Sequence, residues 1–264
     1  MPELAEVAYY CSQWNPGRGC RVERVEARGQ TRCFREANAK QVVAALSGRS
    51  LLRSRTHGKR MLFEFSEDRW LGLHLGMTGR LLIRDVDVGL ERHDHLALKT
   101  SVGWLVFNDP RQFGKVEVFE SQGLPRTWRE LPPEILSEEF DYGFFERILE
   151  RRGRAALKSI LLVQELFPGV GNWMADEILW RARIRPDRRA ISLEASERLA
   201  LFQALRFVCR GAMKRIAPDF SDPPKSWLFK HRWKPGGICP KTGNVLDRSE
   251  VGGRTTCWSS AWQR

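Results

Sequence analysis

The hydrophobic pattern of the chain changes its period at Leu131-Pro132-Pro133, and this change constrains the fold more than any other feature. Before it, short runs of alternating apolar residues are separated by Gly, Glu-Asp and Asp-Pro turn signals, which is typical of antiparallel strands. Beyond it, apolar residues recur at helical spacing. We therefore predict an α+β fold in which a sandwich or barrel of strands is followed, from about Pro133, by a helical domain. The expected strands are 61–65, 70–75, 80–84, 95–100, 104–107 and 115–119, and the expected helices are 142–151, 155–166, 172–183 and 193–213.

Two further helices are predicted ahead of the strands. One covers residues 3–14 and begins after Pro2, whose missing N–H does no harm at a helix start. The other covers residues 39–46 and is stopped by Gly48. At the other end of the chain, Pro218 ends the last helix, and the tail beyond it is rich in Lys and Arg.

The charge of the chain indicates a polyanionic partner. Its 264 residues carry a formal net charge of +12, a surplus typical of proteins that bind nucleic acid. No run approaches the roughly 18 uncharged apolar residues of a transmembrane helix, and the N-terminus lacks the pattern of a signal peptide. Six scattered cysteines without a Cys-x-x-Cys pair indicate reduced thiols. We expect a soluble protein of the cytoplasm, associated with the nucleoid if the chain is bacterial.

Six motifs follow one another along the chain, and their order is more specific than any one of them. Together they resemble the formamidopyrimidine-DNA glycosylase and endonuclease VIII family of base-excision repair enzymes from end to end. The resemblance implies an N-terminal β-sandwich domain over residues 1–133, a helix-two-turn-helix domain over 134–222 and a finger hairpin over 223–264. The motifs are Pro2-Glu3-Leu4-Ala5-Glu6-Val7, His57-Gly58-Lys59, His74-Leu75-Gly76-Met77-Thr78-Gly79-Arg80, Asn108-Asp109-Pro110-Arg111-Gln112-Phe113-Gly114, Gly169-Val170-Gly171-Asn172 and Gly253-Arg254-Thr255-Thr256.

Pro2 is the most informative single residue. Once Met1 is removed, Pro2 carries the terminal amine, and since ordinary α-amino groups have a pKa of about 7.7 to 8, a neutral fraction can attack a sugar carbon. On the terminal residues alone, an ordinary helix start explains Pro2 as well. The resemblance implies that Pro2 is the nucleophile and that Glu3 is the adjacent acid and base. It also implies that Lys59 donates a proton in β-elimination and that Arg254 reaches the phosphate at the lesion and assists δ-elimination.

A DNA-binding surface is implied around these residues. Met77, Arg111 and Phe113 match the wedge that fills the gap left by a rotated base, because an apolar group replaces lost stacking and a guanidinium can bond the orphaned base. A core position for Met77 and Phe113 is the alternative, but the turn signal Asp109-Pro110 favours an exposed tip. The full set of DNA contacts implied by the resemblance is Glu6, His74, Met77, His93, Arg111, Phe113, Arg152, Arg154, Lys158 and Asn172.

Two further patterns in the sequence each have a simpler structural explanation as well. The glycines of Gly169-Val170-Gly171-Asn172 allow a tight turn, and the helix that follows offers unpaired N–H groups to a phosphate; a plain linker between helices is the alternative. Asp94 lies between two histidines, but neighbouring residues on a strand point to opposite faces, so no metal site is predicted there. His95 is expected to be structural.

The tail departs from the zinc-binding pattern of the family. Family members with zinc carry two Cys-x-x-Cys pairs, whereas the aligned positions here are Cys239, Thr242, Ser259 and Trp262. Three thiolates are missing, and neutral side chains do not replace them. We expect a zincless finger without a metal or another cofactor, its hairpin held by packing of Trp227, Trp233, Trp258 and Trp262.

The predicted function is that of a bifunctional DNA glycosylase and abasic-site lyase, acting as a monomer on damaged duplex DNA. The alternatives are a non-catalytic protein that binds damaged DNA through the same groove, and a basic RNA-binding protein. Because the segment from Arg215 to Ile238 is shorter than the loop that covers 8-oxoguanine in the formamidopyrimidine branch, we expect weak activity on that base. Ring-opened formamidopyrimidines, oxidised pyrimidines or hydantoins are expected to be better substrates, and abasic sites the best.

Overall fold

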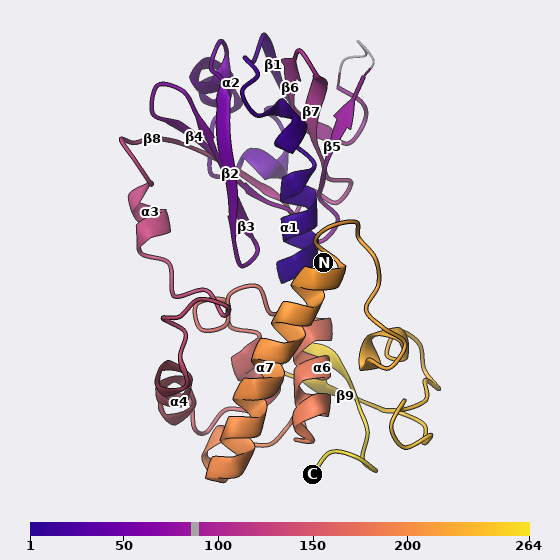
Figure 1. Cartoon of the computed structure of the whole chain (residues 1–264). Coiled ribbons are helices and arrows are strands. Elements are labelled where there is room, and N and C mark those ends of the chain that lie inside the picture. Colours follow the sequence, from indigo (N-terminus) through magenta and orange to yellow (C-terminus); the bar gives the residue numbers. More distant parts are fainter. Residues whose placement is uncertain (86–89) are drawn as a thin grey trace. The chain divides into compact units, whose positions relative to one another are not determined.

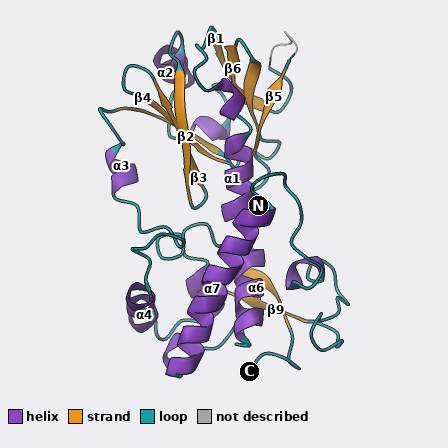
Figure 2. Ribbon diagram, in the orientation of Figure 1, coloured by secondary structure: helices purple, strands orange, loops and turns teal. Residues whose placement is uncertain are grey.

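The computed structural model describes residues 1–85 and 90–264, which divide into two compact units. The first consists of Met1–Pro2 and Glu6–Leu131, and the second of Glu3–Ala5 and Pro132–Arg264. Most strands belong to the first unit and most helices to the second (Figures 1 and 2). Within the described residues, no helix is both long and apolar enough to cross a membrane.

The described strands of the first unit form two antiparallel four-stranded sheets. Their orders are β1-β6-β7-β5 and β2-β3-β4-β8. Side chains from both sheets, such as Phe63 and Phe107, share one buried core, which makes the pair a sandwich. The strands are β1 (Arg24–Ala27), β2 (Leu51–His57), β3 (Arg60–Phe65), β4 (Arg69–His74), β5 (Arg80–Arg84), β6 (Asp94–Thr100), β7 (Gly103–Asn108) and β8 (Lys115–Glu120).

Two of these strands were not predicted from the sequence. β1 and β2 each lie at the edge of a sheet, and most residues of β2 are exposed or half-buried. An edge strand is defined by backbone pairing on one side and does not require apolar alternation. The six predicted strands all form, with ends within one residue of those expected.

Among the residues that the structure describes, three α-helices accompany the sandwich along the chain. α1 (Leu4–Ser12) starts in the second unit and continues into the first, where Val7 and Cys11 enter the sandwich core. α2 (Ala39–Leu46) begins at Asn38, whose side chain accepts a hydrogen bond from Lys40 N, and is followed by Gly48 at φ +77°. The short α3 (Arg126–Arg129) precedes the boundary between the units.

The second unit is built around the long helix α7 (Ala195–Arg215), which packs against α6 (Asn172–Ala182). α4 (Tyr142–Arg151) begins at Asp141, whose carboxylate accepts the Phe144 N–H, and a capping box of Glu194 and Glu197 starts α7. Phe145, Leu205 and their apolar neighbours from these helices form one core.

The helix expected over 155–166 is shorter than predicted. α5 covers only Leu157–Leu161; the chain then turns, and the Gln164 side chain holds this turn. Its amide donates to the carbonyls of Leu162 and Val170 and accepts the Gly169 N–H. The apolar run continues through this turn, so periodicity alone extends the helix too far.

The chain ends in a hairpin of β9 (Asp247–Val251) and β10 (Arg254–Trp258). Val251 pairs with Arg254, so Gly252 and Gly253 are the two central turn residues. Their φ values of +60° and +70° are those of a type I′ turn, which only glycine adopts without strain. Buried apolar residues attach the hairpin region to α6: Trp180, Leu228, Cys239, Leu246 and Cys257, with Trp262 packed against them.

Candidate functional site

Lys59 lies in the two-residue loop that joins β2 to β3. His57 pairs with Arg60 across this hairpin, which leaves Gly58 and Lys59 as the central residues of the turn. Gly58 has φ +56°, as the first central residue of a tight hairpin turn requires. Only 8% of Lys59 is exposed, so the turn presents this lysine in a largely enclosed setting at the end of two strands.

His74 lies at the end of the next strand and is electrostatically coupled to Lys59. Its Nδ1 accepts a hydrogen bond from the backbone N–H of Gly76 at 3.0 Å, which places the ring proton on Nε2. Burial, and after it the positive charges of Lys59 and Arg60, lower the pKa of His74 to about 4. The ring is therefore neutral at physiological pH.

The structure brings the three expected wedge residues together on two touching loops of the first unit. Met77 follows β4 and Phe113 precedes β8, and they are 38% and 37% exposed. Arg111 lies over the Phe113 ring, with its Cζ 4.8 Å from the ring centroid. The loops meet at Gly76, where an added Cβ would lie 2.4 Å from the carbonyl carbon of Phe113. Exposed apolar groups with an adjacent guanidinium can enter a stack of bases.

Asp109 holds these two loops in place, a role that sequence reasoning missed. It is fully buried, and its carboxylate accepts the Thr78 hydroxyl at 2.6 Å and the Gly114 N–H at 2.7 Å. Its carbonyl lies 2.9 Å from Nε2 of His95, which is therefore structural as expected. Its own N–H donates to the carbonyl of His93, directly before β6. The only sequence signal at Asp109 was the Asp-Pro dipeptide. It indicates a turn but does not identify the hydrogen-bond partners of Asp109.

Asp94 likewise has a structural environment. Its carboxylate is ion-paired with Arg84 and accepts a hydrogen bond from Asn108 Nδ2 at 2.8 Å. Among the residues that the structure describes, no group of three or more His, Cys, Asp or Glu side chains is arranged to hold a metal ion.

In the second unit, Glu3 is anchored to the N-terminus of α6. Its carboxylate accepts three backbone N–H bonds, from Gly171 at 2.9 Å, Trp173 at 2.9 Å and Met174 at 3.1 Å. The side chain is 2% exposed, and a carboxylate at a helix N-terminus is stabilised by the helix dipole. The prediction that these N–H groups are free for a phosphate is wrong for these three donors, because Glu3 occupies them.

The two glycines of this turn are needed for different reasons. Gly169 has φ +92°, a conformation that L side chains rarely adopt. Gly171 has an ordinary extended backbone, but an added Cβ would lie 2.3 Å from Cδ of Glu3. Gly171 is therefore required by the close approach of the Glu3 carboxylate.

Lys158 does not contribute an exposed charge for DNA, contrary to prediction. It is fully buried, with its Nζ 2.7 Å from the Asp176 carboxylate, and burial lowers its pKa against the opposing effect of Asp176. The ammonium also donates to the Thr255 carbonyl at 3.1 Å and the Thr256 hydroxyl at 2.7 Å. Lys158 thus fastens β10 to the helices.

Asp176 and Arg232 complete this attachment of the hairpin. Asp176 accepts from Arg232 Nη2 at 2.6 Å and from the Cys257 N–H at 3.0 Å. Asp176 is fully buried and Arg232 is 5% exposed. We call Lys158, Asp176 and Arg232 the buried ion cluster. The sequence contained no pattern that joins these three residues.

Asn172 and Arg254 lie beside this attachment, at the first residue of α6 and the first residue of β10. The Asn172 side chain donates to the same Thr255 carbonyl at 3.0 Å. Arg254 follows the glycine turn and is exposed, so its guanidinium is presented at the hairpin tip. Of the other expected DNA contacts, Arg152 and Arg154 are exposed between α4 and α5, and Glu6 is half-buried on α1.

The finger positions do not fit a zinc ion. Cys239 Sγ accepts a hydrogen bond from Trp180 Nε1 at 3.4 Å, and Trp262 Nε1 donates to the Trp180 carbonyl at 2.9 Å. An indole N–H is only a donor, and Ser259 and Thr242 offer no thiolate. Of the four expected tryptophans, only Trp262 packs into the hairpin cluster, whereas Trp227 belongs to the helical core.

Comparison with known protein families matches both units. Residues 1–116 match the formamidopyrimidine-DNA glycosylase N-terminal domain, and residues 131–220 match the H2TH domain of the same glycosylases. The chain is 32% identical over 275 residues to the formamidopyrimidine-DNA glycosylase of Roseiflexus sp. (strain RS-1), with 100% of both chains covered. It is 35% identical over 221 residues to that of Herpetosiphon aurantiacus, covering 80% of this chain and 81% of the relative.

Solved structures give the same result. Lactococcus lactis Fpg in complex with DNA containing an oxidised pyrimidine has a TM-score of 0.88 and 28% identity, with 100% of each chain covered. The Lactococcus lactis enzyme bound non-covalently to DNA with an abasic site has a TM-score of 0.87 and 28% identity, with 99% of each chain covered. A β-sandwich unit followed by a helix-two-turn-helix (H2TH) unit and a hairpin is the architecture of this class of DNA glycosylases. The chain belongs to the formamidopyrimidine-DNA glycosylase family.

Proposed function

We propose that this DNA glycosylase is also an abasic-site lyase that works through an iminium ion (a protonated Schiff base) on Pro2. After removal of Met1, the Pro2 amine attacks C1′ of the damaged nucleotide, the bond from C1′ to the base breaks, and the base leaves with a proton. The observation that carries the proposal is the anchoring of Glu3 by three N–H bonds, supported by the bond from Leu4 N to the Gly169 carbonyl at 3.0 Å. The amine is thus one residue away from a fixed carboxylate.

The remaining catalytic roles follow from charge and position. Glu3 donates a proton to O4′ as the sugar ring opens to the iminium ion, and its carboxylate then accepts the proton removed from C2′. Lys59 contacts the phosphate and supplies a proton to the leaving oxygen as β-elimination breaks the C3′–O bond. Arg254, exposed at the hairpin tip, binds the second phosphate as δ-elimination, with loss of the C4′ proton to water, breaks the C5′–O bond.

The DNA is held by the wedge and by phosphate contacts. Met77 and Phe113 replace the stacking lost when the damaged nucleotide rotates out, and Arg111 bonds the base left behind. Arg152 and Arg154 add exposed positive charge. Asn172, whose side chain lies beside the hairpin backbone at Thr255, adds a polar contact to a phosphate. We propose that the protein acts as a monomer.

We propose a lesion preference in which abasic sites are processed fastest and 8-oxoguanine is excised slowly. Ring-opened formamidopyrimidines, oxidised pyrimidines or hydantoins are intermediate. The segment between α7 and β9 supports this order, because its centre is tied down. Trp227 and Leu228 are buried in the helical unit, and Arg232 is held by Asp176. Little chain remains to cover a base and to make the hydrogen bonds that distinguish 8-oxoguanine from guanine.

The experiment is single-turnover cleavage of end-labelled duplexes that carry one abasic site or one lesion each. Wild-type protein should nick the abasic duplex and leave phosphates at both ends, and it should act on 8-oxoguanine more slowly. Arg254→Ala should accumulate the β-elimination product. Lys59→Met should slow both steps. Tight binding without a nick would instead identify a non-catalytic damage-binding protein.

We further propose that the finger functions without zinc. Elemental analysis of purified protein should find no stoichiometric zinc, and a chelator should leave nicking of the abasic duplex unchanged. One zinc per chain would show that the finger positions have been assigned wrongly.

A further inference from the structure

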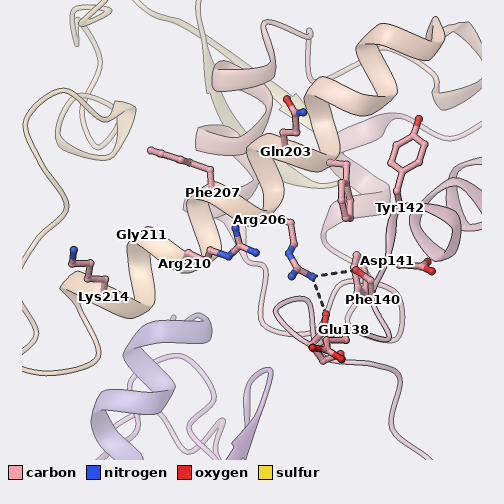
Figure 3. Close-up of a pocket in the computed structure, with 12 residues that line it drawn as sticks. Glu138, Phe140, Asp141, Tyr142, Gln203, Arg206, Phe207, Arg210, Gly211 and Lys214 are labelled. Atoms are coloured by element: carbon pink, nitrogen blue, oxygen red, sulfur yellow. Dashed lines mark hydrogen bonds between the residues drawn. The ribbon is translucent and has the colours of Figure 1, made fainter.

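A hollow of about 740 Å³ lies on the helical unit and takes no part in the chemistry above (Figure 3). It is formed by one face of α7 and by the segment of residues 137–142 that leads into α4. Its volume falls in the range of about 300 to 1,000 Å³ that is typical of ligand pockets. The residues that matter below are Phe140, Tyr142, Phe202, Arg206, Arg210 and Lys214.

The wall of the hollow on α7 is cationic at regular intervals. Arg206, Arg210 and Lys214 follow one another at four-residue spacing, which places them on one helix face with a rise of about 6 Å per step. Arg206 is already used within the fold, since its Nη1 donates to the carbonyls of Ile135, Ser137 and Phe140. Figure 3 shows this guanidinium reaching from α7 to the opposite segment.

Arg210 and Lys214 differ from Arg206 in having no role in the fold. Both are exposed, and among the described residues neither makes a hydrogen bond or ion pair. Arg206 therefore fixes the walls of the hollow, while Arg210 and Lys214 leave two positive charges open along its rim.

Aromatic side chains form the apolar part of the lining. Phe202 packs edge-on against Tyr142, with their ring centroids 5.5 Å apart, and Phe140 is fully buried behind them. Glu138 and Asp141 are the two carboxylates on this wall, and Asp141 also accepts the Phe144 N–H. The hollow thus combines a ring-lined floor with a cationic rim on one side and two carboxylates on the other.

We propose that this hollow binds a short acidic segment of a partner protein. A large apolar side chain of the segment sits among the rings, and its carboxylates pair with Arg210 and Lys214. Alternate residues of an extended chain lie about 6.6 Å apart, which matches the rise of about 6 Å between these two cations. In such interfaces a buried aromatic side chain and the charge pairs around it usually contribute most of the binding free energy.

Charge complementarity favours a polypeptide over DNA as the occupant. A DNA backbone is uniformly anionic and would be repelled by Glu138, whereas a peptide backbone supplies N–H donors for that carboxylate. The rings also suit a single apolar side chain better than a row of phosphates. The proposal is independent of the catalytic roles, which involve none of these residues.

The test is fluorescence anisotropy with the full chain and a labelled nine-residue peptide that contains one Phe flanked by Asp and Glu residues. Wild-type protein should bind it saturably, and a peptide with Ala in place of Phe should bind about tenfold more weakly. Arg210→Glu and Lys214→Glu should each weaken binding by about tenfold as well. Arg215→Glu is the matched control, because Arg215 is an exposed cation of the same helix outside the hollow, and it should change binding less than twofold.

A second measurement separates this surface from the DNA interface. Arg210→Glu should nick the abasic duplex at the wild-type rate and bind it with wild-type affinity. Absence of saturable peptide binding, or equal loss in Arg215→Glu, would overturn the proposal. Loss of duplex affinity in Arg210→Glu would assign the hollow to DNA, and a concentration-dependent dimer abolished by Arg210→Glu would assign it to a second copy of the chain.

Discussion

At the scale of single residues, two buried carboxylates position the groups of the site by accepting backbone or hydroxyl hydrogens. Glu3 fixes the start of the chain to α6, and Asp109 fixes the two wedge loops to each other. Hydrogen bonds to a charged group contribute about 1.5 to 3 kcal/mol each. The start of the chain and the wedge loops therefore depend on buried carboxylates for their positions.

Gly171→Ala tests the Glu3 anchor directly. The new Cβ would meet Glu3 Cδ, so the free energy of unfolding should fall by about 2 kcal/mol, and nicking of abasic DNA should slow more than tenfold. Gly143→Ala is the control, because its Cβ would make only ordinary contacts in α4. Chemical denaturation and single-turnover cleavage measure both effects. Wild-type stability and rate in Gly171→Ala would contradict the role of the anchor.

The lowered pKa of His74 predicts that the free energy of unfolding depends on pH. Its pKa in the folded chain, about 4, lies below the ordinary value of 6.5. Between these values the unfolded chain binds more protons, so the free energy of unfolding rises with pH, by about 3 kcal/mol across the window. The stabilisation is complete above pH 6.5 and is lost as the pH falls to about 4. His74→Gln, unfolded in urea at several pH values, should show a shallower rise. An unchanged slope would refute the assignment.

The exposure of a site residue could be predicted from the sequence where a local turn signal lies beside that residue. The Asp109-Pro110 turn placed Arg111 and Phe113 at an exposed tip, as observed. The anchoring of Glu3 could not be predicted, because its partner Gly171 lies 168 residues away. The burial of Lys158 depends on β10, which is also distant in the chain.

At the scale of elements, the hairpin is attached by charge as well as by packing. The buried ion cluster connects α5, α6 and the segment before β9 to the backbone of β10. Apolar contacts around Trp180 and Cys239 cover the same region. Together they hold the hairpin that presents Arg254.

Asp176→Asn tests the buried ion cluster. The substitution leaves Lys158 and Arg232 buried without a counter-charge, which should lower the free energy of unfolding by about 3 to 5 kcal/mol. Nicking should also shift towards the β-elimination product as Arg254 loses its position. The matched control is Glu130→Gln, which removes an exposed pair with Arg126 and should cost less than about 1 kcal/mol. Equal effects of the two substitutions would contradict an anchoring role.

Element prediction from the sequence succeeds where side-chain pattern and burial coincide. α4 and β5 have the expected ends because each has an amphipathic or alternating pattern and a clear turn beside it. β2 was missed because its side chains are mostly not buried. The end of α5 was missed because the apolar run continues into the turn that the Gln164 side chain holds.

At the scale of the whole molecule, the residues assigned to one reaction are divided between two units. Pro2, Lys59 and the wedge belong to the first, and Glu3 and Arg254 belong to the second. The order of short motifs along the chain was enough to predict the family, because each motif lies at a turn or terminus whose chemistry is local. The attachments within each unit required the structure.

The most direct test of the account is to identify the residue that becomes covalently attached to DNA. Mature protein beginning at Pro2 is incubated with an abasic duplex and borohydride, and the digested adduct is mapped by mass spectrometry. The account predicts a reduced sugar fragment on the nitrogen of Pro2, and no adduct when Met1 is retained. An adduct on a lysine such as Lys59, or equal trapping with Met1 in place, would contradict it.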